Sequence, residues 1–562
     1  MPLCSMRWRA SVGSNPAVAD SAAHRYAGVP LAGAVPAVSL PDLIREAARG
    51  RPDSPALVDA ITGRQVGFHE LDRRIGVLAA GLADAGLRPG HTLLLFAPNS
   101  PDWPIVALAG MAAGAAVSGA NPQYGAGDLA HQMRDAGVSF VATTMAGLAV
   151  VRDALQRCSD RAVLVVLMDG SAPDAIALDA LEAPRFAAAG ASLPAVVPQA
   201  LAALPYSSGT TGLPKGVMLT HRTLVTNVKQ VNQVLGLVPG DVVLAFLPMF
   251  HIYGFTAVTL CALAAGVTVV TLPRFEPASF LDAIERHRVT RLAVVPPVLQ
   301  FLASHPAVDG RDLSTLSRIT SGAAPLSAEL EERVARRVGK RVTQGYGMTE
   351  SSGVIATTPH GQGRPGASGR LLPATEARVV DPATGADVAP GEAGEIWFRG
   401  PQAFAGYLNQ PEATASMCTP DGWVRTGDIG RFDADGYLFI TDRLKELIKV
   451  KGFQVAPAEL EALLCQHPDV ADAAVIGRPD ERAGELPVAW VVPRSPELTP
   501  DALREWVAGR VVVYKQLADV VLCRAIPKTA AGKILRRELR RLDAQRERGP
   551  EGSGPEGRGR DA

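Results

Sequence analysis

The segment from Ser207 to Gly216, which reads Ser-Ser-Gly-Thr-Thr-Gly-Leu-Pro-Lys-Gly, has the composition of a loop that binds phosphate. Its glycines permit positive φ and let backbone N–H groups converge on an anion, its hydroxyls add hydrogen-bond donors, and its lysine adds a positive charge. The sequence therefore predicts nucleotide chemistry, with phosphate ligands at Ser207, Ser208, Gly209, Thr210, Thr211, Gly212 and Lys215.

The spacing within this segment differs from that of a P-loop. A P-loop has four residues between its glycines and a Ser or Thr directly after its lysine. Here two residues separate Gly209 from Gly212, and Gly216 follows Lys215, so no hydroxyl stands where a P-loop would hold magnesium. A solvent-exposed turn is the alternative interpretation, because Gly, Ser, Thr and Pro cluster in loops. The spacing favours a phosphate loop of another kind.

The segment Gln344–Glu350 adds an aromatic ring, a hydroxyl and a carboxylate. Tyr346 could stack on a nucleotide base, and Glu350 could hold Mg²⁺ beside phosphates, because Mg²⁺ takes carboxylate and phosphate oxygens as ligands. An ordinary core aromatic and an acid in the first turn of a helix are the alternative interpretations of these two residues.

Three later segments supply an acid and a set of basic residues. Asp428 follows Thr426 and Gly427 in a tight turn, where a carboxylate can accept both hydroxyls of a ribose. Lys533 follows a turn of small residues near the C-terminus. Taken singly, the acid could be a turn residue and the basic cluster a solvated face. That cluster, which could neutralise a polyphosphate, comprises Arg443, Lys445, Lys449 and Lys451.

The composition excludes a general affinity for polyanions. The chain has 562 residues with 56 basic and 56 acidic side chains, so its formal net charge is zero and no global field attracts nucleic acid or an anionic membrane. We expect small-molecule partners and a monomer or homodimer. The six cysteines include no Cys-x-x-Cys pair, which favours a reducing, cytoplasmic compartment over a disulfide framework or zinc site.

The alternation of short aliphatic runs with helical patterns between residues 40 and 300 predicts an α/β fold with parallel sheets. The uncharged stretch Phe255–Leu272 predicts a buried helix over Phe255–Ala265 and a core strand over Val267–Leu272 instead of an integral membrane segment. Gly-rich turns between short strands predict a β-rich subdomain over Glu376–Ile440, and a small α+β domain follows Asp442.

The predicted organisation has four parts. A disordered extension covers residues 1–35, and a large N-terminal domain of layered α/β sheets covers 36–441. The small C-terminal domain covers 442–545, and a disordered tail, low in apolar residues, covers 546–562.

In this order and at this spacing, the motifs resemble those of the adenylate-forming superfamily, which includes acyl-CoA synthetases, luciferases and peptide-synthetase adenylation domains. The resemblance runs from about residue 40 to residue 541. The segments Phe250–Tyr253, Ser321–Leu326 and Lys451–Glu461 resemble the branch that holds 4-coumarate:CoA ligases and luciferases.

This resemblance implies roles for individual residues. It implies that the phosphate loop binds ATP, that Thr349 contacts a phosphate, that Glu350 is the Mg²⁺ ligand, and that Asp428 binds ribose. Lys533 would bridge the carboxylate and the α-phosphate, and His251 would orient the carboxylate. Adenine would lie against Ala323, Gln344, Gly345 and Tyr346. The acid would lie against His251, Tyr253, Ala257, Gly345 and Val354. The nucleotide would also contact Arg443, Lys445, Lys449 and Gln454.

The resemblance also implies a reaction in two halves, in which a carboxylic acid and ATP form an acyl-AMP that coenzyme A then converts to a thioester. In the family the small domain rotates between the halves about a hinge at the position of Asp442 and is therefore mobile. Lys451 and Gly452 would then serve the thioester-forming state, and Arg274 would contact the CoA phosphates.

The substrate implied is a hydrophobic acid, either of aryl or cinnamic type or a medium- or long-chain fatty acid. Thr343 and Gly353 depart from the plant 4-coumarate ligase pattern, and Ala257 stands where those enzymes commonly carry a serine. Two alternatives stay open: a stand-alone ligase that loads the acyl group onto a carrier protein, and a non-catalytic nucleotide-binding homologue.

Overall fold

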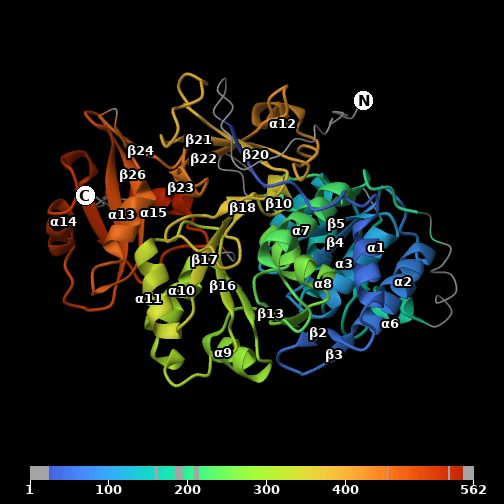
Figure 1. Ribbon diagram of the computed structural model, residues 1–562. Coiled ribbons are helices and arrows are strands. Elements are labelled where there is room, and N and C mark those ends of the chain that lie inside the picture. The colour runs from blue at the N-terminus through green and yellow to red at the C-terminus, as the bar shows by residue number, and fades with distance from the viewer. Residues whose placement is uncertain are drawn as a thin grey trace, which may run out of the picture.

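The computed structural model describes residues 25–158, 162–183, 193, 195–207, 214–451, 453–529 and 532–548. The predicted ligands Ser208–Gly212 and Gly452 therefore lie outside the described residues, as do most of the predicted N-terminal extension and C-terminal tail. Figure 1 shows a large body on the right and centre, and a smaller body of the last hundred residues, coloured orange to red, on the left.

The first sheet has seven strands in the order β12-β9-β5-β4-β6-β7-β8 and is parallel except where β12 meets β9. Its central strand β4 is buried at all five residues, the pattern of a parallel strand covered on both faces. The bounds are β4 Thr92–Phe96, β5 Ala116–Gly119, β6 Val138–Thr143, β7 Leu164–Leu167, β8 Ile176–Ala177, β9 Leu201–Ala203 and β12 Leu219–Thr220.

The second sheet has nine strands in the order β19-β18-β17-β16-β15-β13-β14-β2-β3, with a parallel centre and antiparallel edges. Its strands β15, β16 and β17 end at the site described below. The bounds are β2 Pro55–Asp59, β3 Gln65–Gly67, β13 Val242–Ala245, β14 Thr268–Thr271, β15 Arg291–Val294, β16 Arg318–Ser321, β17 Val342–Tyr346, β18 Ala356–Thr357 and β19 Arg370–Leu371.

Helices form a layer between these two sheets. Helices α1, α2, α3, α7 and α8 pack against one another; α3 contacts β4 and β5 of the first sheet, whereas α2 and α8 contact β2 and β14 of the second (Figure 1). Their bounds are α1 Leu40–Arg49, α2 Phe68–Asp84, α3 Asp102–Ala112, α7 His221–Leu235 and α8 Cys261–Ala264. The predicted layered α/β architecture is confirmed.

The remaining helices of the large domain are short, and several begin at a polar cap that satisfies free backbone N–H groups. The Ser327 hydroxyl, for example, accepts a hydrogen bond from the N–H of Leu330 at the start of α11. The bounds are α4 Ala126–Asp135, α5 Leu148–Gln156, α6 Leu178–Leu181, α9 Pro277–Arg286, α10 Pro296–Ser304, the 3₁₀ turn η4 Pro306–Val308, α11 Ala328–Val338, the 3₁₀ turn η5 Thr349–Ser351 and α12 Pro411–Met417.

The uncharged stretch Phe255–Leu272 folds into a helix and a buried strand, as predicted, but the helix is wider than expected. Residues Tyr253–Leu260 form a π-helix, η3, which continues into α8. The Thr259 hydroxyl donates a hydrogen bond to the Gly254 carbonyl at 2.8 Å, within the widened turns. Strand β14 then occupies the second half. No helix in the described ranges is long and apolar enough to span a membrane.

A third, antiparallel sheet β1-β20-β21-β22-β23 confirms the predicted β-rich subdomain. Beside it, the two-stranded hairpin β10–β11 flanks the predicted phosphate loop. The bounds are β1 Arg25–Ala27, β10 Tyr206–Ser207, β11 Lys215–Gly216, β20 Glu376–Val380, β21 Gly394–Arg399, β22 Val424–Phe432 and β23 Leu438–Arg443.

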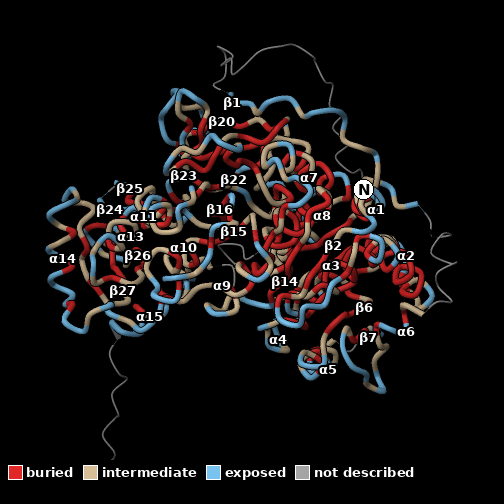
Figure 2. Tube along the Cα trace, turned by 60° about the horizontal axis from the view of Figure 1, so that its bottom comes forward, coloured by how far each residue is buried: buried red, intermediate tan, exposed pale blue. Residues whose placement is uncertain are grey.

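The small domain is a five-stranded sheet with helices, in which β28 joins β27 beside the order β25-β24-β27-β26. Its apolar core is separate from the main core of the large domain, and Figure 2 shows the buried residues gathered in each of the two bodies. The bounds are β24 Ile448–Val450, β25 Phe453–Val455, α13 Pro457–Leu464, β26 Val470–Asp480, β27 Gly484–Pro493, α14 Pro500–Ala508, the 3₁₀ turn η6 Val513–Lys515, β28 Asp519–Leu522 and α15 Arg536–Arg548.

Candidate active site

A cavity of about 980 Å³ lies among the strands of the second and third sheets and the C-terminal turn of the small domain. Strands β15, β16 and β17 supply one wall, the β22–β23 pair supplies another, and Lys528, Thr529 and Lys533 close it from the small domain. Both domains therefore contribute side chains to one site, a common place for ligands to bind.

Asp428 is the buried centre of a polar triad whose other members, Tyr346 and Arg443, are half-buried. Its carboxylate accepts a hydrogen bond from the Tyr346 hydroxyl at 2.7 Å and pairs with Arg443 Nε at 3.1 Å, and the residue is 5% exposed. Asp428 and Arg443 face each other across β22 and β23. Burial, and then the Asp428 charge, raise the pKa of Tyr346, so its hydroxyl stays protonated.

The turn Thr426–Asp428 aims this carboxylate. The Thr426 hydroxyl accepts a hydrogen bond from the Asp428 N–H at 3.0 Å, and Gly427 adopts φ +69°, a conformation that favours glycine. The Gly427 N–H donates to the Glu395 carboxylate at 3.0 Å. Thr426 and Gly427 line the cavity, while the Asp428 carboxylate lies behind Tyr346 and Arg443, which also line it.

Glu350 faces the hairpin that flanks the phosphate loop. It is 5% exposed, and its Oε1 accepts hydrogen bonds from the Tyr407 hydroxyl at 2.7 Å and the Ser207 hydroxyl at 3.3 Å. Lys215 Nζ lies 5.1 Å from the centroid of the Tyr407 ring. The Glu350 carboxylate, the Tyr407 hydroxyl and the Lys215 ammonium, which come from three distant segments, thus converge at one end of the cavity.

His251 and Tyr253 lie at the N-terminus of the π-helix η3 and line the same cavity. The Nδ1 atom of His251 accepts a hydrogen bond from the Tyr253 N–H at 3.2 Å, so the neutral ring carries its proton on Nε2. Burial, and then the nearby positive charge of Lys533, lower the pKa of His251 to about 4. The imidazole is therefore neutral at pH 7 and can donate one hydrogen bond.

Lys533 enters the cavity from the C-terminal turn of the small domain. The Thr529 hydroxyl accepts a hydrogen bond from the Lys533 N–H at 3.1 Å, and the Thr529 N–H donates to the Lys533 carbonyl at 2.8 Å. A Cβ atom on Gly532 would lie 3.1 Å from the side chain of Val295, so the turn packs against the large domain. Burial, and then the Arg443 charge, lower the pKa of Lys533 to about 8.

Comparison with known proteins settles the family. The family described as AMP-binding enzyme matches residues 44–408, and the family described as AMP-binding enzyme C-terminal domain matches residues 459–533. The chain belongs to the AMP-binding enzyme family. The family predicted from the motifs is therefore confirmed.

Its similarity to individual members extends over nearly the whole chain. It is 42% identical to a protein named 4-coumarate–CoA ligase 5 from Oryza sativa subsp. japonica, over 89% of this chain and 94% of that protein. It is 41% identical to a 4-coumarate–CoA ligase from Pinus taeda, over 87% and 92%. The solved structure of ATP-bound MatB from Rhodopseudomonas palustris shares its fold with a TM-score of 0.79 at 29% identity, covering 89% of this chain and 98% of that one.

The cavity of this AMP-binding enzyme brings together residues predicted from segments hundreds of positions apart. The predicted residues that line it are Ser207, Lys215, His251, Tyr253, Ala257, Ala323, Gly345, Tyr346, Thr349, Glu350, Val354, Arg443, Lys445 and Lys533.

Other predicted residues lie away from the cavity. Gln344 is buried beneath it and donates hydrogen bonds to the Leu326 carbonyl and the Glu331 carboxylate. Lys449 and Gln454 face each other across β24 and β25 on the exposed side of the small domain. Arg274 and Lys451 are also exposed and do not line the cavity.

Many residues that line the cavity were not predicted from the sequence, and three of them bear on its chemistry. Tyr407, which holds Glu350, stands in a segment with no motif of its own, so no sequence signal marks it. Arg291 and Arg318 line the cavity from the starts of β15 and β16. Each is a lone charge at the edge of an otherwise uncharged strand, and that pattern is a signal that could have found them.

The loop that carries Glu350 requires a glycine at position 347. A Cβ atom there would lie 2.0 Å from the Gly353 carbonyl oxygen and 2.7 Å from Val354 Cα, both backbone atoms. We expect Gly347→Ala to cost at least about 1–3 kcal/mol of folding free energy, because the loop must shift to admit the methyl group. The melting temperature and ATP-dependent activity of the variant measure this effect.

Gly363→Ala is the matched control for this prediction, because the nearest atom to its Cβ would be a Thr343 methyl carbon at an ordinary 3.7 Å. We expect that control to melt within about 2 °C of the parent chain. Equal melting temperatures and equal activities for the two variants would show that the loop tolerates a side chain at position 347.

Proposed function

We propose that this chain is an ATP-dependent, AMP-forming ligase that joins a hydrophobic carboxylic acid, of aryl or cinnamic type, to coenzyme A. The observation that carries this proposal is the meeting of Lys533 and His251 in one cavity, where burial, and then the lysine charge, keep the imidazole neutral. The names of the 4-coumarate–CoA ligases to which the chain is similar support the same substrates.

In the first half of the proposed reaction, a carboxylate oxygen of the acid attacks the α-phosphorus of ATP. The bond from the α-phosphorus to the bridging oxygen breaks, and pyrophosphate leaves. The attacking group and the phosphate are both anions, so the site must offset their repulsion and align them. We assign the carboxylate to the Nε2–H of His251 and the charge on the α-phosphate to Lys533.

The remaining polar groups of the cavity fit the rest of ATP. We assign the ribose hydroxyls to the Asp428 and Arg443 pair, the adenine ring to the face of Tyr346 beside Gly345 and Ala323, and the phosphates to Thr349, Lys215 and the phosphate loop. The positive charges at this end, Lys215 and Arg443, complement the negative charge of the nucleotide.

Glu350 fits the role of a magnesium ligand. It is a buried carboxylate that faces the cavity and, among the described residues, forms no ion pair. No cluster of three or more potential metal ligands occurs in the described part of the chain. That matches Mg²⁺, which is commonly held by one or two carboxylates together with substrate phosphates. When bound, the ion would neutralise charge on the phosphates.

In the second half, the sulfur of coenzyme A attacks the acyl carbon, the thiol proton passes to solvent, and AMP leaves with the oxygen that the acid supplied. The exposed position of Lys451 fits a face that approaches the nucleotide only after the small domain rotates. At the predicted hinge, the Asp442 carboxylate accepts hydrogen bonds from the N–H groups of Arg443 and Ala458, at 2.7 and 2.9 Å.

The test of this function is release of pyrophosphate from ATP over a panel of cinnamic, benzoic and straight-chain fatty acids, with and without coenzyme A. We expect release that depends on the acid, and an acyl-CoA product only when coenzyme A is present. Transfer to a carrier-protein arm but not to coenzyme A would identify the alternative acceptor. ATP binding without acid-dependent release would identify a non-catalytic homologue.

The pH dependence of adenylation should report the pKa of Lys533. The ammonium group is charged below its pKa and neutral above it, so activity should fall as pH rises through about 8. The measurement is kcat/KM for ATP against pH, which follows the free enzyme. In Lys533→Arg the falling limb should move above pH 10, because a guanidinium keeps its charge there. If the falling limb of the pH profile stays near pH 8 in Lys533→Arg, a group other than Lys533 titrates there.

We propose that the enzyme works in the cytoplasm. Its reactants ATP and coenzyme A, and thiols at Cys158, Cys261, Cys465 and Cys523 that form no disulfide, support that compartment. The subunit number stays a prediction of monomer or homodimer.

A further inference from the structure

Two arginines stand side by side in the part of the cavity wall remote from Lys533. Arg291 begins β15 and Arg318 begins β16, and the two residues are partners in the parallel register of these strands. Both line the cavity. Because alternate residues of a strand share a face, Arg318, Thr320 and Gly322 line one track along β16 and just beyond it.

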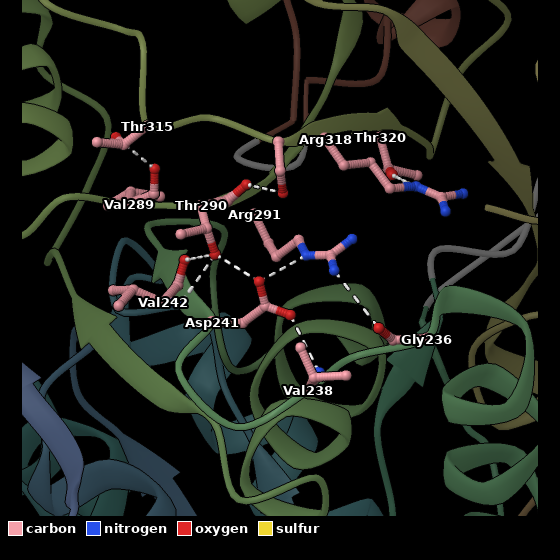
Figure 3. A network of polar contacts seen from close by, with 11 residues as sticks. Gly236, Val238, Asp241, Val242, Val289, Thr290, Arg291, Thr315, Arg318 and Thr320 are labelled. Carbon is pink, nitrogen blue, oxygen red and sulfur yellow. Dashed lines mark hydrogen bonds and ion pairs between the residues drawn. The ribbon is translucent and has the colours of Figure 1, made fainter. Parts of the chain in front are cut away.

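These arginines are incompletely neutralised. Arg291 Nε pairs with the Asp241 carboxylate at 2.9 Å, and Figure 3 shows that carboxylate held also by the Thr290 hydroxyl and the Val238 N–H. The Nη1 atom of Arg291 is buried, and no hydrogen-bond partner occurs for it in the described structure.

Arg318 has no carboxylate partner within the described ranges. Its Nε donates to the Thr320 hydroxyl at 3.3 Å and its Nη2 donates to the Thr358 carbonyl, yet the residue is only 8% exposed. Burial, and then the Arg291 charge, lower the pKa of its guanidinium to about 10, which leaves it charged at pH 7. Two guanidinium groups against one carboxylate leave a net positive charge in the wall, and a buried charge without a partner is costly.

The cavity lining also contains a set of apolar side chains, and Leu235, Leu237 and Val243 among them lie beside Arg291. The set includes the side chains of Val231, Leu235, Leu237, Val243, Ala257, Val258 and Val354. Arg318 and Gly322 are four residue steps apart along extended chain, so the track is roughly 13 Å long, and Gly322 packs against Tyr253. The pocket therefore has the shape of an apolar slot with a positive charge at its far end.

We propose that the acid substrate carries a second carboxylate at the end remote from the reacting carboxyl, and that Arg318 binds it with the charge of Arg291 beside it. This inference rests on the proposed function, because it assigns the body of the acid to the apolar slot. The second carboxylate would neutralise the excess charge of the two guanidinium groups and accept a hydrogen bond from Arg318.

The experiment compares pairs of acids that differ only at the far end: 4-carboxycinnamate with 4-methylcinnamate, and octanedioate with octanoate. With the wild-type chain, we expect kcat/KM for pyrophosphate release to be about 10- to 100-fold higher for the carboxylated acid than for its partner, in whichever pair is turned over faster. One hydrogen bond to a charged group contributes enough free energy to give a ratio of that size. A 4-hydroxycinnamate arm distinguishes an anion site from a phenol site, and equal or better use of the phenol would overturn the proposal.

Substitutions at Arg318 test whether this side chain produces the preference for the carboxylated acid. Arg318→Met should remove the 10- to 100-fold preference while it keeps or improves turnover of 4-methylcinnamate, which also shows that the variant folds. Arg318→Lys should keep part of the preference, and the control Arg336→Met, on the exposed face of α11, should keep all of it. An equal loss for both acids in Arg318→Met would assign the arginine a structural role only.

The outcomes separate this inference from the proposed function. If the monocarboxylic acids are turned over and the carboxylated members are not preferred, the inference fails and the ligase assignment stands. If no acid releases pyrophosphate, the ligase assignment fails, and calorimetric binding of the same acid pairs decides whether the two arginines form an anion site.

Discussion

Replacing Lys533 by alanine is expected to lower the rate of acyl-AMP formation by about 100- to 1000-fold, the usual effect of removing one preorganised group that stabilises transition-state charge. Lys533 lines the cavity from the small domain, and its charge adds to the effect of burial in lowering the pKa of the His251 imidazole. The measurement is acid-dependent pyrophosphate release in a single turnover, with all substrates saturating.

The same variant should form thioester from supplied acyl-AMP and coenzyme A at nearly the parent rate, because in the proposed scheme the small domain has rotated and Lys533 has left the site. Lys515→Ala is a matched control, since that lysine belongs to the same domain but pairs with Glu459 at 2.7 Å and does not line the cavity. An equal loss of both half-reactions in Lys533→Ala would contradict the rotating-domain assignment.

The second large effect is expected for Asp428→Asn, which should raise the KM for ATP about 10- to 100-fold and leave the KM for the acid nearly unchanged. The substitution keeps the size of the side chain and an acceptor for the Tyr346 hydroxyl, but removes the charge that Arg443 pairs with. Hydrogen bonds to a charged group contribute about 1.5–3 kcal/mol, which corresponds to that range.

Nucleotide analogues sharpen this prediction. The parent chain should use 2′-deoxy-ATP and 3′-deoxy-ATP less well than ATP, and Asp428→Asn should lose much of that discrimination, because the deleted hydroxyl and the deleted charge belong to one interaction. If the variant discriminates against the deoxy analogues as strongly as the parent chain does, Asp428 does not contact the ribose.

Much of the fold and of the nucleotide end of the site could be predicted from the sequence. Glu350, Asp428 and Lys533 stand in motifs whose residue types suit a nucleotide, and short aliphatic runs that alternate with helical patterns predict parallel strands. The stretch Phe255–Leu272 shows the limit of such patterns, since apolar periodicity indicates a buried helix but does not distinguish the π-helix of Tyr253–Leu260 from an α-helix.

Contacts between distant segments of the site could not be predicted in the same way. Tyr407 meets Glu350 only because the chain folds back over 57 positions, and no local pattern records that contact. Arg291 and Arg318 lie 27 positions apart in sequence and become neighbours through the register of β15 and β16. Contacts between such distant positions, and the excess of two arginine charges over the one Asp241 charge, arise only when the chain folds and leave no pattern in the sequence.

The most direct test of the ligase assignment follows the oxygen atoms of the acid. A turned-over acid labelled with ¹⁸O in its carboxylate should give AMP that carries one ¹⁸O atom for each acyl-CoA formed, because the attacking carboxylate oxygen stays on the α-phosphorus when the thiol displaces AMP. Mass spectrometry of AMP, pyrophosphate and orthophosphate measures this. Unlabelled AMP, or label in pyrophosphate or orthophosphate, would contradict the acyl-AMP route.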